Sequence, residues 1–306
     1  MSGFLDRHCP TCGSAEARAE VKARQVAEAM PPETLRAFWS GLFKDKCFFT
    51  YHRCGGCGLL YNQSFFDGAA LSSLYASMAP NMDAVATDAI AATQRGYFER
   101  AASRDTLHGG YLEIGPDVGH IAEEAAKTGD FQHFWLFEPN RAVHPALREA
   151  VGERRVTICV DMEDLSAVPD RSIGLAVMVH VLDHLLDPLA MLRQIRAKLR
   201  PGGTLMLVTH NEQSLLRSLM GSRWPAFCLQ HPQLYNPATI VALLQDAGYC
   251  EIGVERSRNH FPIDFLARQA AWAVGMKLAK MPLPSASIGL RLGNILTLAG
   301  RSRLGG

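Results

Sequence analysis

Tyr-Leu-Glu-Ile-Gly-Pro-Asp-Val-Gly, residues 111–119, is the segment from which the fold of this chain can be read. An apolar run carries a carboxylate at Glu113 and ends at Gly115, and a helical pattern begins just after Gly119. This order predicts a buried strand, a tight turn and the start of a helix. Such a turn lets a ligand approach the bare backbone, and a helix start offers unpaired N–H groups to an anion. We therefore expect a ligand site at this turn.

The bulk composition is that of a soluble globular protein. The chain has 306 residues, which can hold one large core and a small module, with 48% hydrophobic and 20% charged residues. Its net charge of +1 gives no electrostatic reason to expect nucleic acid. No apolar run approaches the roughly 20 residues of a membrane span, and the N-terminus lacks a signal pattern. We expect a cytoplasmic protein whose eight cysteines are metal ligands and core residues.

Two Cys-x-x-Cys pairs stand near the N-terminus, Cys9 with Cys12 and Cys54 with Cys57, and glycine follows each pair. Two residues between thiolates suit a tight knuckle that turns both sulfurs toward one tetrahedral ion. Four thiolates predict a closed structural zinc site in a small zinc ribbon. The alternatives are reduced or redox-active cysteine pairs, or ligation by the flanking His8 or His52.

The two knuckles are 41 residues apart, whereas about 15–20 is usual. The excess is interpreted as a helical insertion, because 15–30 is rich in helix-forming residues and Pro31-Pro32 interrupts it. A second helix is expected over 33–43. The sequence thus predicts a zinc-binding module over 1–66, and a helical linker over 67–107.

Beyond residue 107 the chain alternates between strand and helix patterns, which predicts a doubly wound α/β sheet. Glu138 ends the second expected strand, where such a sheet presents an acidic side chain to ribose hydroxyls. The alternative is an ordinary surface glutamate. Strands are expected over 110–114, 133–137, 156–160, 173–179, 204–209, 251–257 and 294–300, and helices over 120–127, from Pro188, and over 237–247.

Five motifs together resemble the class I S-adenosylmethionine (SAM)-dependent methyltransferases in order and spacing. They are Glu113-x-Gly115-x-x-x-Gly119, Glu138, Asp161-Met162-Glu163, the run from His180 to Pro188, and Leu199-Arg-Pro-Gly-Gly203. With the two knuckles, the chain resembles the zinc-containing branch of that superfamily, many members of which methylate sugars, glycans or natural products. Asp117 departs from the motif, because it stands in place of the middle glycine.

The resemblance implies a Rossmann-like, seven-stranded fold over 108–306 with an antiparallel last strand. It also implies that Gly115 and Gly119 line the methionine part of SAM, Glu138 binds ribose, and Asp161 with Met162 contacts adenine. The implied cofactor-binding set is Glu113, Gly115, Asp117, Gly119, Glu138, Pro139, Asp161, Met162 and His180.

His180, Asp183 and His184 follow the fourth expected strand and are the candidate catalytic residues. The ligand crevice of an open α/β sheet lies beyond the carboxyl ends of its strands, so these side chains would face the transferred methyl group. A histidine can deprotonate a hydroxyl or an activated carbon, and Asp183 could orient it. In the alternative interpretation the backbone contacts SAM while one histidine simply packs.

The candidate acceptor-binding residues lie further along, at His210 and Asn211 after the fifth strand and at His231 and Tyr235 in an aromatic loop. A structural hydrogen bond is the alternative for His231. The segment 262–281 has an amphipathic pattern that could lie on a membrane interface or cover an apolar substrate. It could equally pack on the domain itself or on a second copy, so a homodimer is compatible with the sequence.

The sequence therefore predicts SAM-dependent methyl transfer to a small molecule, with structural zinc as a second cofactor. Oxygen is favoured as the methyl acceptor, and carbon is the second choice. A non-catalytic scaffold protein is the alternative from another class. A nicotinamide-dependent oxidoreductase would require Gly-x-Gly-x-x-Gly, which this turn lacks.

Overall fold

The computed structural model describes residues 4–39, 47–76, 87–104, 107–267 and 286–302. A mixed seven-stranded sheet lies at its centre, in the order β10-β9-β8-β11-β12-β17-β14. The strands are β8 (His108–Ile114), β9 (Asp130–Phe137), β10 (Val156–Cys159), β11 (Ile173–Val179), β12 (Leu199–His210), β14 (Cys250–Arg256) and β17 (Asn294–Gly300). Only β17 runs antiparallel to its neighbours β12 and β14, as the sequence predicted.

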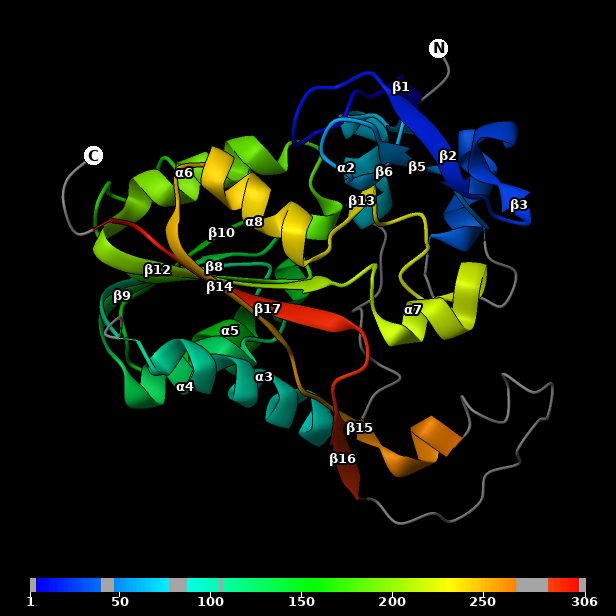
Figure 1. Cartoon of the computed structure of the whole chain (residues 1–306). Coiled ribbons are helices and arrows are strands. Elements are labelled where there is room, and N and C mark those ends of the chain that lie inside the picture. Colours follow the sequence, from blue (N-terminus) through cyan, green and yellow to red (C-terminus); the bar gives the residue numbers. More distant parts are fainter. Residues whose placement is uncertain (1–3, 40–46, 77–86, 105–106, 268–285, 303–306) are drawn as a thin grey trace.

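Helices cover both faces of this sheet (Figure 1). One face carries α6 (Pro188–Lys198) and α8 (Pro237–Asp246). The other carries α3 (Thr87–Ala102), α4 (His120–Thr128) and α5 (His144–Val151). Alternate residues of β11 serve the two layers: Ala176 and Met178 pack toward α6 and α8, whereas Leu175 and Val177 pack toward α3 to α5. This two-sided burial explains why β11 is a continuous apolar run.

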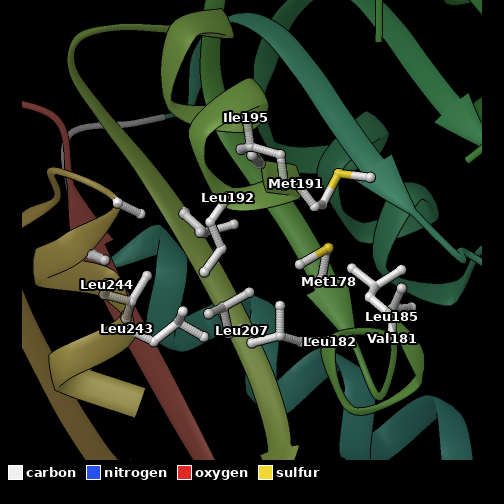
Figure 2. Packing of buried hydrophobic residues seen from close by; sticks show 14 of the residues in the cluster. Met178, Val181, Leu182, Leu185, Met191, Leu192, Ile195, Leu207, Leu243 and Leu244 are labelled. Atoms are coloured by element: carbon white, nitrogen blue, oxygen red, sulfur yellow. The ribbon is translucent and has the colours of Figure 1, made fainter. Parts of the chain in front are cut away.

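The loop after β11 is anchored in the core by its apolar residues. Val181, Leu182 and Leu185 lie next to Met178 in Figure 2, in the same core cluster as Met191 of α6. The short 3₁₀ helix η4 (Leu182–His184) lies within this loop. Because the apolar residues fix the loop, its polar residues are held at the carboxyl edge of the sheet.

The N-terminal part forms small sheets beside that edge (Figure 1). β1 (Phe4–Asp6) pairs with β7 (Ser64–Phe66), and β3 (Gln25–Val26) pairs with β4 (Cys47–Phe48). A four-stranded sheet contains β2 (Ala17–Val21), β5 (Tyr51–Cys54), β6 (Leu60–Asn62) and β13 (Gln233–Leu234). β13 comes from the part of the chain that forms the central sheet, between β12 and β14, so the two parts share one four-stranded sheet.

The predicted helix over 15–30 is wrong. This segment contains β2, β3 and the short 3₁₀ helix η1 (Ala27–Ala29). The expected second helix is reduced to α1 (Pro32–Leu35) and η2 (Arg36–Phe38), and its remaining residues 40–43 lie outside the described part of the chain. β2 pairs with β5, which carries Cys54, and this tertiary pairing overrides the local helix propensity.

Two helices lie within the expected linker: α2 (Gly68–Ala76) and α3. Near the C-terminus, β15 (Asn259–Pro262) pairs with β16 (Ser287–Leu290) in a separate two-stranded sheet next to α3. Most of the predicted amphipathic segment 262–281 lies outside the described residues, which stop at 267 and resume at 286. The three domain boundaries stay predictions.

The loop between β12 and β13 contains α7 (Leu215–Met220) and η5 (Gly221–Arg223). None of the helices that the structure describes has the length and apolar character needed to cross a membrane.

Candidate functional site

The turn after β8 has the left-handed backbone that its glycines predict. The φ angles of Gly115 and Gly119 are +69° and +86°. A Cβ at Gly115 would lie 2.6 Å from Cγ2 of Val181, so the turn packs directly against the loop after β11. Asp117 also adopts a positive φ of +53°, a conformation that aspartate tolerates better than most residues. Asp117 thus preserves the left-handed backbone at the position where the resembled family has glycine.

Glu138 connects this turn to the end of β9. Its Oε2 accepts a hydrogen bond from the Asp117 N–H at 3.1 Å, and its Oε1 accepts one from the Asn140 N–H at 2.8 Å. Burial raises the pKa of Glu138, although these backbone donors act in the opposite direction. Each carboxylate oxygen retains a second lone pair for a ligand hydroxyl. The arrangement fits a ribose diol next to the open N-terminus of α4.

The end of β10 lies beside the end of β9, where the Glu138 N–H donates to the Cys159 carbonyl at 2.8 Å. Asp161 is exposed, and its Oδ1 accepts a hydrogen bond from the Glu163 N–H at 2.9 Å. Met162 is half-buried against the core. Val160 is 39% exposed and adds apolar surface beside them, a feature that the sequence interpretation missed. Pro139 is exposed next to Glu138.

Glu113 lies inside the core beneath the turn. It is 2% exposed and accepts a hydrogen bond from the Tyr111 hydroxyl at 2.6 Å. Burial raises the pKa of Glu113 to about 7, and the nearby Glu138 charge adds to the increase. Its burial and its bond to Tyr111 indicate support of the turn from below.

A cluster of histidines surrounds Asp183 at the carboxyl ends of β11 and β12. Ring centroids are 4.5 Å apart for His180 and His210, 4.8 Å for His210 and His231, and 4.7 Å for His231 and His184. The structure therefore brings together His180, Asp183, His184, His210 and His231, which the sequence predicted from three separate segments. We call these five residues the histidine cluster.

Asp183 is paired with His210. Its Oδ2 accepts hydrogen bonds from Nδ1 of His210 at 2.7 Å and from the His210 backbone N–H at 3.0 Å. Burial opposes ionisation of this fully buried carboxyl, but the bond with His210 and the other imidazoles outweigh it and lower the pKa of Asp183. The sequence had indicated a pair of Asp183 with the adjacent His184.

Burial keeps three imidazoles of the cluster uncharged. It lowers the pKa of His180 to about 3, and it also lowers the pKa values of His184 and His210. His231 differs: burial disfavours its charge, yet the neighbouring Cys228 and Asp183 raise its pKa to about 9. Nδ1 of His231 lies 2.7 Å from the Ala226 carbonyl and 3.3 Å from Sγ of Cys228.

Asn211 and Tyr235, the other two predicted acceptor-binding residues, are buried. Asn211 is buried, and its Oδ1 accepts a hydrogen bond from the Gln213 N–H at 3.0 Å. Tyr235 is fully buried in the core cluster that includes Cys9 and Tyr61. Asn294, at the start of β17, was missed: its Nδ2 lies 3.2 Å from Nε2 of His180. Because β17 runs antiparallel to β12, its first residue, Asn294, lies opposite His210 at the carboxyl end of β12.

Two buried polar residues connect the N-terminal part to η4. The Gln233 side chain donates to the Leu182 and Leu185 carbonyls at 3.1 and 2.7 Å, and its Oε1 accepts from Arg7 at 3.0 Å. Arg7 also donates to the Leu186 carbonyl at 3.1 Å. Burial lowers the pKa of Arg7 to about 10. These contacts hold the loop of the histidine cluster against β1 and β13.

The four knuckle cysteines converge. Their Sγ atoms all lie within 4.8 Å of one another, and the Cys9–Cys57 and Cys12–Cys54 pairs are each 3.5 Å apart. Both knuckles have the same backbone: Gly13 and Gly58 have positive φ and donate to the carbonyls of Cys9 and Cys54. Sulfurs at 2.3 Å from a tetrahedral ion would be about 3.8 Å apart, so the arrangement fits zinc. The described residues contain no disulfide.

Comparison with known proteins agrees with this geometry. The family described as "Methyltransferase domain" matches residues 70–250. A SAM-dependent methyltransferase structure from Archaeoglobus fulgidus is similar, with 16% identity, a TM-score of 0.50, and coverage of 71% of this chain and 95% of that one. A structure of the Haloferax volcanii Trm112 methyltransferase activator with a putative methyltransferase has 14% identity, a TM-score of 0.50, and coverage of 70% and 94%. No curated protein matched the chain.

At these identities the structural matches support the fold, whereas the family match spans more than half of the chain and includes the glycine turn, Glu138 and the whole histidine cluster. The chain therefore belongs to the methyltransferase domain family and is a SAM-dependent methyltransferase.

Proposed function

We propose that this methyltransferase transfers a methyl group to an oxygen atom of a small molecule, such as a sugar, a glycan precursor or a natural-product intermediate. The observation that carries the proposal is the histidine cluster, which gives the acceptor side of the crevice polar groups suited to a hydroxyl. Near-neutral net charge and the absence of a basic stripe in the sequence argue against nucleic acid as the acceptor.

The donor side is proposed to hold SAM through its backbone and carboxylates. Gly115, Asp117 and Gly119 would lie along its methionine part, and Glu138 would accept from the ribose hydroxyls. Asp161, Met162 and Pro139 would surround adenine, with Val160 as apolar support. Glu113 would support the turn, and the backbone at His180 would close the site, since His180 itself has a positive φ of +53°.

SAM supplies an electrophilic methyl group whose transfer leaves a neutral thioether. The acceptor oxygen forms the new bond to this methyl carbon as the sulfur–carbon bond breaks, so alignment of the three atoms is the main requirement. A hydroxyl must also lose its proton. We propose His184 as the group that takes it: it is the polar residue of η4 that keeps exposed surface, whereas Asp183 is fully buried.

Asp183 and His180 would act beside His184, Asp183 by fixing His210 and His180 by lining the methyl path. His210 and His231 would contact the acceptor, whereas Asn211 and Tyr235 would shape its wall from their buried positions. Transfer to carbon would use the same cluster to form an enolate-like nucleophile, and it remains the second choice.

The four cysteines are proposed to bind a structural zinc ion. The support is the donor set of four thiolates and the matched geometry of the two knuckles. Assignment to the zinc-containing branch depends on this ion. A cytoplasmic location, contact of 262–281 with a membrane, and a homodimer remain predictions from the sequence.

Calorimetric titration with SAM and with S-adenosylhomocysteine tests the donor site. We expect micromolar binding of both, weakened at least tenfold in Glu138→Ala, because one charge-assisted contact is lost. Glu149→Ala, an exposed glutamate of α5, is the matched control and should bind normally. Equal affinity in Glu138→Ala would remove the ribose role.

Turnover with a panel of hydroxylated acceptors tests the acceptor side. His184→Ala should keep SAM affinity and lose turnover, whereas His133→Ala, which replaces a histidine of β9 stacked on Trp135, should keep both. Full turnover in His184→Ala would exclude it as the proton acceptor.

A further inference from the structure

Asp183 has an unsatisfied oxygen in the centre of the histidine cluster. Its side chain is 0% exposed, its Oδ2 is occupied by His210, and its Oδ1 has no hydrogen-bond partner. A buried carboxylate oxygen without a donor is costly, since it has lost its water and gained nothing. A cation at Oδ1 would remove this cost.

Two imidazoles are placed to share such a cation. One ligand atom each from His180, Asp183 and His210 can be chosen so that all three lie within 4.8 Å of one another. Ligand atoms 2.0–2.2 Å from one tetrahedral ion are about 3.3–3.6 Å apart, so side-chain movements of up to about 1.5 Å would close the site. Cys9, Cys12, Cys54 and Cys57 form the other group with this property among the described residues.

Both imidazoles can present a nitrogen to the ion. Nδ1 of His210 lies 2.7 Å from Oδ2 of Asp183, and an ion bound between these two atoms would take the place of the proton that they share. Nε2 of His180 faces the Asn294 side-chain amide at 3.2 Å, while its buried Nδ1 has no partner. An amide can present its oxygen to an imidazole N–H, and Nδ1 would then be free to bind.

We propose that His180, Asp183 and His210 bind one divalent transition-metal ion at the acceptor side of the crevice, separate from the four-cysteine site. Two imidazoles and one carboxylate suit Zn²⁺, Co²⁺, Fe²⁺ or Ni²⁺, and three protein ligands leave a coordination position open. His180 and His210 keep partial exposure, so that position is accessible.

The role of the ion in methyl transfer rests on the proposed function. The ion would select, as methyl acceptors, small molecules that coordinate it through the hydroxyl that is to be methylated. Metal coordination lowers the pKa of a bound hydroxyl, so the proton can leave to His184, which is outside the three ligands. The oxygen gains the methyl group, and the thioether departs neutral.

Equilibrium dialysis of the full chain with Co²⁺, followed by elemental analysis of cobalt and zinc, tests the metal site without any turnover. We expect one cobalt per chain beyond the ion at the cysteines, bound at least tenfold more weakly in Asp183→Asn and His210→Ala. His133→Ala should bind cobalt as the unchanged chain does. Near-UV circular dichroism checks that Asp183→Asn, a nearly isosteric change, is folded.

The proposal is overturned if the unchanged chain takes up no cobalt beyond the ion at the cysteines, or if folded Asp183→Asn and His210→Ala bind cobalt as tightly as the unchanged chain. Calorimetry with SAM and the acceptor panel separates this result from the proposed function. Cobalt binding without methyl transfer would leave the metal site standing and contradict the function. Methyl transfer by a chain that binds no additional metal would contradict the metal site and leave the proposed function standing.

Discussion

Glu113→Gln should change how the stability of this protein depends on pH. Glu113 is 2% exposed within β8, and burial raises its pKa from 4.5 to about 7. Glutamine has the shape of the protonated carboxyl and still accepts the hydrogen bond from Tyr111. The substitution therefore removes the ionisation while keeping the packing and the bond.

The sign follows from proton binding. Between pH 4.5 and about 7 the folded chain holds a proton at Glu113 that the unfolded chain has released, so the free energy of unfolding falls as pH rises. The pKa difference corresponds to about 3 kcal/mol at 1.36 kcal/mol per unit. This penalty is absent below pH 4.5, is complete above about pH 7, and does not exist in Glu113→Gln.

Urea unfolding of both chains without SAM, at a series of pH values from about 4 to about 8, measures the effect. The buried histidines titrate in this range too, but they are common to both chains and cancel in the difference. Stability of the variant relative to the unchanged chain should rise by about 3 kcal/mol across the series. A difference that stays constant with pH would show that Glu113 ionises normally and would refute the reasoning.

Three further changes test the rest of the molecule. Gln233→Leu leaves the Leu182 and Leu185 carbonyls and the Arg7 guanidinium without a buried hydrogen-bond partner. Urea unfolding should therefore show a free energy of unfolding lower by about 3 kcal/mol. Gln213→Leu, which replaces an exposed glutamine, is the control and should change the free energy of unfolding little. Cys54→Ser should lower zinc content and melting temperature together, with Cys159→Ser, outside the four-cysteine site, as the control; a metal-free chain of full stability would contradict the knuckle interpretation. Asp117→Gly should leave SAM affinity within about threefold, because the left-handed backbone and the N–H to Glu138 are both kept, and a large gain would show that the aspartate side chain opposes binding.

The central sheet could be predicted because each buried strand has its own sequence pattern. The range 173–179 was predicted from its unbroken apolar run, and β11 spans those residues because both faces are covered. The N-terminal insertion could not be predicted in the same way. Residues 15–30 have helix-forming composition, but β2 is held as a strand by pairing with β5, and that pairing places Ala17 opposite Cys54.

The residues of the site could be predicted, but their partners could not. His180, Asp183 and His210 were identified as ends of strands, which is a property of the local pattern. Adjacency in sequence pointed to His184 as the partner of Asp183, whereas the hydrogen bond runs to His210 across the β11–β12 pair. Asn294 lies next to His180 because β17 runs antiparallel beside β12; this direction was expected from the sequence, but the contact across the sheet edge was not inferred from it.

The link between the cysteine module and the acceptor site depends on contacts still more distant in sequence. Arg7 and Gln233 are separated by 226 positions, and together they hold the carbonyls of the loop that carries Asp183 and His184. Cys9 lies two residues from Arg7, and β13 extends the sheet that contains the second knuckle. Loss of the cysteine site would therefore disturb the histidine cluster as well as the N-terminal fold. Turnover should fall in Cys54→Ser even where SAM still binds, because the contacts of Arg7 and Gln233 hold the loop after β11 and do not include the glycine turn or Glu138.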